Sequence, residues 1–153
     1  MSKAFTRESD DQVEGLLKLP SRLPPGTKNY CTSHGVARLR QTLQKLSSQP
    51  VSPDVRQRIH DLEQVLLSAV VVETPPLPWT QVSFGATVAV LDQHDVTETY
   101  NIVGVNETEL ESDNISWLSP IAKALHKGRV GEKVRLQSPA GERILEIIKI
   151  TYH

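Results

Sequence analysis

Cysteine is nearly absent from this chain of 153 residues, in which Cys31 is the single example. One thiol excludes an internal disulfide bond and suits a reducing compartment. A zinc site needs several Cys or His ligands at short spacings. The five histidines show no His-x-x-x-His pair and no Cys–His set of that kind: they are His34, His60, His94, His126 and His153. We therefore expect no metal site and no cofactor.

A basic excess and a long apolar run are also missing. The formal net charge is -1 and the sequence pI is about 6.5, so broad neutralisation of DNA phosphates is not supported and nucleic acid is expected only as an indirect partner. No run of eighteen apolar residues occurs, and acidic residues stand where a signal peptide has its apolar segment. These absences predict a cytoplasmic protein without membrane contact.

The chain has none of the short motifs that mark common hydrolytic sites. There is no Gly-x-Ser-x-Gly sequence for a nucleophilic serine and no Walker-type loop for a nucleotide. We therefore expect a binding protein rather than an enzyme, with no small-molecule substrate.

Two amphipathic segments dominate the first half of the chain. Apolar residues at helical spacing follow Thr32 or Ser33, either of which is a suitable N-cap: Val36, Leu39, Leu43 and Leu46. Pro50 ends this run, and Ser52-Pro53-Asp54 opens a second helix with the stripe Val55, Ile59, Leu62, Leu66 and Ala69. Similar lengths and a short connection predict a small antiparallel coiled-coil hairpin within residues 29–72.

The last seventy residues are strand-like. Val82, Phe84, Ala86, Val88 and Val90 alternate with smaller or polar residues, which predicts a strand over 82–91 with return strand 96–105. Further strands are expected at 115–118, 133–137 and 143–152, and Ser119-Pro120 opens a short helix that Gly128 would end. This pattern predicts an α+β fold, with an antiparallel sheet domain at residues 81–153.

Two other segments complete the predicted organisation. Residues 1–28 combine charges with prolines and read as a flexible N-terminal tail, and residues 73–80 read as a Pro-rich linker in which Trp79 packs on one of the domains. The loop 107–113 holds Glu107, Glu109, Glu111 and Asp113. It could attract a basic partner, but we expect a solvated loop.

Several short sequence motifs occur in an order that resembles the GreA/GreB family of bacterial transcription elongation factors: Phe84-Gly85-Ala86-Thr87-Val88, Ile102-Val103-Gly104, Ser119-Pro120-Ile121-Ala122-Lys123-Ala124-Leu125 and Ser138-Pro139-Ala140-Gly141-Glu142. The family pattern at the start of the hairpin also resembles Thr32, Gly35, Leu39 and Leu43. The resemblance implies an FKBP-like sheet domain. It also implies that this domain docks on RNA polymerase near the secondary channel, on a coiled coil of the largest subunit.

The resemblance places the polymerase-binding surface at Ser119, Pro120, Ile121 and Ala122. The alternative is a purely structural role, in which Ser-Pro is simply a good helix start and Ile121 belongs to the core. The family motifs around these residues lead us to prefer the binding role.

The hairpin departs from the family at its tip. Family members carry two acids there, which hold a magnesium ion at the polymerase active centre, whereas this chain has only Asp54 between Leu46 and Val55. One carboxylate is a poor magnesium site, and helices of about fifteen residues reach only about 25 Å. We therefore expect regulation of elongation without stimulated transcript cleavage. The alternatives are retained cleavage stimulation and an FKBP-like prolyl isomerase, although aromatic residues are only 5% of the chain.

Overall fold

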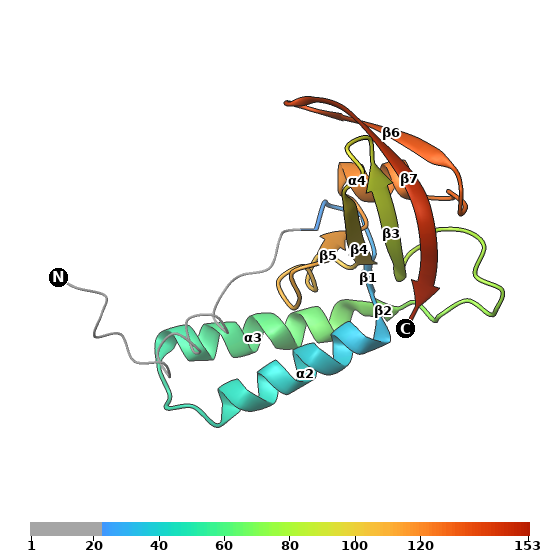
Figure 1. Ribbon diagram of the computed structural model, residues 1–153. Helices are drawn as coiled ribbons and strands as arrows, with labels where there is room; N and C mark the ends of the chain where they lie inside the picture. The colour runs from blue at the N-terminus through green and yellow to red at the C-terminus, as the bar shows by residue number, and fades with distance from the viewer. Residues whose placement is uncertain (1–22) are drawn as a thin grey trace.

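The computed structural model describes residues 23–153, so most of the predicted tail lies outside the described residues. The elements are β1 (Asn29–Cys31), α2 (Ser33–Ser47), α3 (Pro53–Ser68), β2 (Ala69–Val71), β3 (Ala86–Asp92), β4 (Thr97–Val103), β5 (Asn114–Ser116), α4 (Pro120–Leu125), β6 (Lys133–Ser138) and β7 (Gly141–Tyr152). The two long helices lie side by side below the sheet, and their connecting turn is far from it (Figure 1). The predicted α+β architecture is confirmed.

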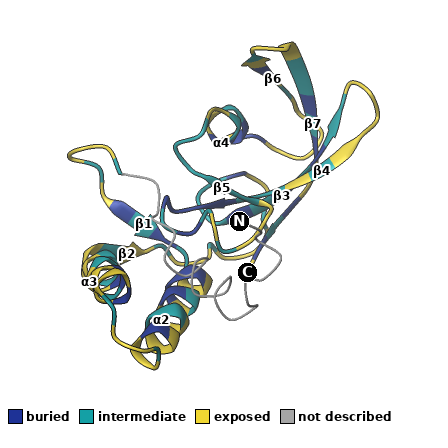
Figure 2. Cartoon of the chain, turned by 90° about the vertical axis from the view of Figure 1, so that its left-hand side faces the viewer, coloured by how far each residue is buried: buried dark blue, intermediate teal, exposed yellow. Residues whose placement is uncertain are grey.

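Each long helix begins at the predicted cap. The Thr32 side chain accepts a hydrogen bond from Gly35 N at 3.0 Å, and the Ser52 side chain accepts one from Val55 N at 3.2 Å. These bonds satisfy backbone donors that have no partner within a helix. The predicted stripes face each other, as the dark inner sides of α2 and α3 in Figure 2 indicate, around a buried cluster of Leu39, Leu46, Val55 and Leu62. Each fully buried leucine contributes about 2 kcal/mol.

The sheet has the strand order β5-β4-β3-β7-β6, and one of its pairings is parallel. The antiparallel expectation holds for β3 with β4, β3 with β7 and β6 with β7, but it is wrong for β4 with β5. The loop of residues 104–113 carries the chain back along β4 before β5 begins, so the two strands run in the same direction. A tight hairpin, by contrast, would reverse the chain.

Several predicted ends of helices and strands differ from those in the structure. β3 begins at Ala86, not at position 82, because Val82 exchanges backbone hydrogen bonds with Lys127 and Gly128 at 2.8 Å each instead of joining the ladder. Helix α4 ends at Leu125, where His126 caps it, and Lys127 adopts the left-handed conformation with φ 66°. Gly128 is therefore not the helix stop. A side chain at Gly128 would instead collide with Ile147 and the Leu125 carbonyl oxygen.

A two-stranded parallel sheet joins the two ends of the hairpin. Strand β1 pairs with β2 through Asn29↔Ala69, Tyr30↔Val70 and Cys31↔Val71. The expectation that Ala69 belongs to the helical stripe is wrong, because its ψ of 129° is that of an extended residue. This pairing brings the start of α2 and the end of α3 to the same place, beside the larger sheet.

The core of the sheet domain is a separate cluster. It includes Val88, Leu125 and Ile147. The sides of α2 and α3 that face away from each other are exposed (Figure 2). Trp79 packs on this cluster, with its ring 5.6 Å from that of Tyr152, which confirms that the residue packs on a domain. The assignment of domain boundaries stays a prediction. No helix within residues 23–153 is long and apolar enough to cross a membrane.

Cys31 is expected to resist thiol reagents in the folded protein. Its side chain is fully buried, and burial, followed by the nearby Glu107 carboxylate, raises the pKa of the thiol to about 12. The reactive thiolate is therefore scarce and inaccessible at pH 8. Ellman's reagent should label less than a tenth of the protein in buffer and all of it in denaturant. Full labelling of native protein within minutes would contradict this placement.

Candidate functional site

The four predicted docking residues surround the start of α4, but they play different structural parts. Ser119 is the N-cap and accepts a hydrogen bond from Ala122 N at 3.3 Å. Ala122 is only 2% exposed and belongs to the sheet core, whereas Pro120 is exposed and Ile121 is half-buried against that core. Pro120 and Ile121 are therefore the residues that a partner at this turn would meet, while Ser119 and Ala122 hold the turn in place. The docking role itself stays a prediction.

A hollow of about 250 Å³ lies beside this turn. Its walls come from separate parts of the chain: Phe84, Ile102, Trp117, Ala122, Lys123 and His126. Phe84 and Trp117 stack edge to face at 6.4 Å, and Tyr30 joins them at 5.3 Å from Trp117. The apolar walls and the exposed Lys123 suit an apolar side chain that carries acidic neighbours.

Sequence reasoning missed most of this hollow, since Phe84, Ile102 and Trp117 are distant in sequence and are brought together only by the fold of the sheet domain. The aromatic character of Phe84 and Trp117 was the one available signal, because aromatic residues are few in the chain. Two of the six residues that line the hollow, Phe84 and Trp117, are among those few.

The loop that follows β4 is only partly the solvated loop we expected. Glu109, Glu111 and Asp113 are exposed, but Glu107 is 1% exposed, so the expectation is wrong for Glu107. Its Oε2 accepts hydrogen bonds from Gly104 N at 2.7 Å and Thr32 N at 3.0 Å, and its Oε1 accepts one from the Thr32 hydroxyl. A carboxylate from the sheet domain thus lies at the N-terminus of α2, where the helix dipole favours negative charge.

Burial raises the pKa of Glu107, and the hydrogen bonds from Thr32 and Gly104 oppose that rise. Two glycines make room for this contact. A side chain at Gly35 would overlap the Glu107 carboxylate, and one at Gly104 would overlap the Tyr30 carbonyl oxygen. Backbone and carboxylate therefore approach one another as closely as glycine permits.

More polar contacts flank Glu107 along the same interface. Glu111 lies 3.2 Å from His34 Nε2 and 3.4 Å from Arg38 Nη1, and Arg38 Nη2 donates to the Leu110 carbonyl oxygen at 3.4 Å. Asn106 Nδ2 donates to Asn29 Oδ1 at 2.9 Å. The first turns of the hairpin are thus held by one loop of the sheet domain. A cleft of about 330 Å³ borders this contact.

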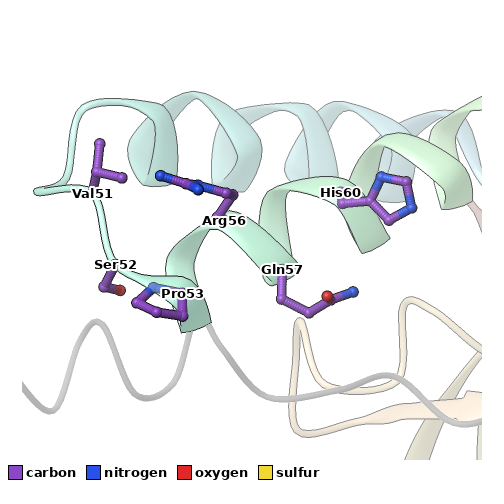
Figure 3. Close-up of a pocket in the computed structure, with 6 residues that line it drawn as sticks. All are labelled: Val51, Ser52, Pro53, Arg56, Gln57 and His60. Carbon is purple, nitrogen blue, oxygen red and sulfur yellow. The ribbon is translucent and has the colours of Figure 1, made fainter.

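The far end of the hairpin is poor in carboxylates. The hollow of about 510 Å³ beside the first turns of α3 is lined by Val51, Ser52, Pro53, Arg56, Gln57 and His60 (Figure 3). None of these is an acid, and Arg56 and His60 provide basic groups. Asp54 lies in the first turn of α3, where its negative charge interacts favourably with the helix dipole. Within residues 23–153, no three His, Cys, Asp or Glu side chains gather as a metal site would require.

Comparisons with known proteins agree on one family. The model described as "Transcription elongation factor, GreA/GreB, C-term" matches residues 77–152. Transcription elongation factor GreA of Rhodospirillum rubrum is 38% identical over 96 residues, and GreB of Neisseria meningitidis serogroup B is 39% identical over 100 residues. These matches cover 62% and 65% of this chain, and only 61% of the length of either relative.

Other relatives align over more of the chain. GreA of Nautilia profundicola is 33% identical over 137 residues, which is 89% of this chain and 84% of that protein. Among solved structures, GreA/GreB from Nitrosomonas europaea is 25% identical, with coverage of 82% and 100% and a TM-score of 0.45. GreA factor homolog 1 of Thermus thermophilus is 22% identical, with coverage of 82% and 99% and a TM-score of 0.42.

Proposed function

The chain belongs to the GreA/GreB family of transcription elongation factors, and on that premise we propose that it binds RNA polymerase through its sheet domain and regulates elongation without stimulating transcript cleavage. The proposed partner is the coiled coil of the largest polymerase subunit, near the secondary channel. The protein then acts in the cytoplasm, meets nucleic acid only through the polymerase and catalyses no reaction of its own.

The turn at the start of α4 and the hollow beside it support the docking part of this proposal. Pro120 and Lys123 are exposed, Ile121 is half-buried, and the adjoining hollow is lined mainly by apolar atoms from Phe84, Ile102 and Trp117. An apolar centre with a polar or charged rim is the usual make-up of a specific protein interface. The tip of a helical coiled coil can provide both an inserted apolar side chain and charged neighbours.

The composition of the hairpin tip supports the second part. A magnesium ion held against a polymerase needs at least one or two carboxylates at a fixed geometry. The hollow at the tip is instead lined by Arg56, His60 and uncharged residues. Helices of 15 and 16 residues also extend only about 24 Å. The tip therefore fits a role in obstructing or contacting the channel better than one in delivering a metal ion.

Addition of the protein to backtracked elongation complexes tests this reading. We expect no shortened transcripts above the level of intrinsic cleavage, even at a hundredfold molar excess, because the tip has one acid only. A cleavage-competent GreA run in parallel is the positive control. Cleavage products that depend on the protein would favour the alternative, in which it is a stimulating factor.

A further inference from the structure

Glu107 joins the two halves of the molecule through one side chain. Its carboxylate is bonded at the same time to Thr32, the N-cap of α2, and to Gly104 at the end of β4. Thr32 in turn accepts the hydrogen bond of Gly35 N. The first turn of the hairpin and the sheet domain therefore share a continuous set of hydrogen bonds across 75 residues of sequence.

These hydrogen bonds restrain the direction of the hairpin relative to the sheet domain as well as the distance between them. Hydrogen bonds weaken steeply when donor and acceptor turn away from alignment, and two donors from Thr32 approach the two oxygens of one carboxylate. Gly35 and Gly104 approach their neighbours so closely that neither position has space for a side chain. The pairs that Glu111 makes with His34 and Arg38 act on the same turns of α2, but they are exposed and contribute less.

We propose that Glu107 is a positioning residue, which sets the direction in which the hairpin projects from the docking domain. The proposal rests on the proposed function, because the direction matters only if the sheet domain is anchored on the polymerase. None of the residues that line the hollow beside α4 bonds to Glu107. Loss of Glu107 should therefore leave docking intact and remove the regulatory effect, since a hairpin that points in many directions rarely occupies its target.

Distances between two labels test the positioning role without any polymerase. Spin labels at Val51→Cys on the hairpin turn and Val96→Cys on the β3–β4 turn, both exposed in the native protein, report the direction of the hairpin in the full chain with Cys31→Ala. We expect the distance distribution to widen at least twofold in Glu107→Ala. It should stay unchanged in Asp113→Ala, which alters an exposed acid of the same loop.

A folded Glu107→Ala protein with the wild-type distribution would overturn the positioning role. If Glu107→Ala does not fold, Glu107→Asp replaces it, because the shorter side chain keeps the charge but cannot reach Thr32 and Gly104 together. Its distribution should again be wider than that of the wild type, and an unchanged width would count equally against the proposal.

A second measurement uses the same variants on polymerase. We expect Glu107→Ala to bind RNA polymerase within twofold of the wild-type affinity while its effect on elongation rate falls at least fivefold. Wild-type regulation by a variant with a widened distribution would overturn the link to function. If the wild-type chain itself fails to bind, the proposed function fails, yet the distance measurement still decides whether Glu107 positions the hairpin.

Discussion

Replacement of Gly104 by alanine is expected to lower the free energy of unfolding by about 4 kcal/mol. The new methyl group would overlap the backbone oxygen of Tyr30 and press on the Glu107 carboxylate. Overpacking of this kind typically costs 1–3 kcal/mol, and disturbance of the hydrogen bond from Gly104 N to a buried carboxylate adds about 1–3 kcal/mol. Because the obstructing atom belongs to the backbone, a change of side-chain rotamer cannot relieve the overlap.

Urea denaturation followed by circular dichroism measures this loss, and Gly131→Ala is the matched control. Gly131 has φ 91° and no heavy atom within 4 Å of the added methyl group, so only backbone strain of about 1–2 kcal/mol is expected there. A Gly104→Ala variant as stable as Gly131→Ala, or more stable, would mean that the β1 strand does not lie against the end of β4.

The helical hairpin could be predicted from sequence because its signals are local. Leu39, Leu43 and Leu46 recur at helical spacing in the first helix, and each N-cap lies three residues before the amide that it accepts from. Such periodicity depends only on the geometry of one helix. The strands of the sheet domain were likewise placed by alternation, with errors of a few residues at their ends.

The contacts between the halves could not be predicted because their partners are distant in sequence. Glu107 stands in a loop with three exposed acids, and nothing in the pattern distinguishes the one that is buried. The β1–β2 pairing has only three residues in each strand, too few for an alternating pattern to register. Gly35 matched a family pattern, but the reason that it must be glycine, the Glu107 carboxylate, lies across the fold.

The same distinction between local and long-range signals applies to the proposed docking turn, which consists of residues 119–122. Ser119 and Pro120 were recognisable as a helix start, and the structure uses Ser119 for that purpose. Which of the four residues can touch a partner depends on burial, and Ala122 is turned into the core. Within one short motif, some residues therefore stabilise the turn from inside, and others present the surface that a partner could contact.

Ile121→Asp is expected to weaken binding to RNA polymerase at least tenfold. Ile121 is the half-buried apolar residue of the docking turn, and a charge there would have to be desolvated when a partner covers it. Affinity measured by fluorescence anisotropy, at a temperature where circular dichroism shows the variant folded, gives the change. Loss of a few kcal/mol of stability is also expected, since Ile121 packs on the sheet core.

Two further variants separate binding from folding in this experiment. Val96→Asp makes a similar change at an exposed apolar residue, roughly 20 Å along β4 from Ile102, and should bind like the wild type. Lys123→Glu reverses an exposed charge beside the hollow and should slow association with an acidic partner by severalfold, most strongly at low salt. Binding that survives both Ile121→Asp and Lys123→Glu would place the docking surface elsewhere on the sheet domain, because these two residues, with Pro120, form the part of the turn that a partner can reach.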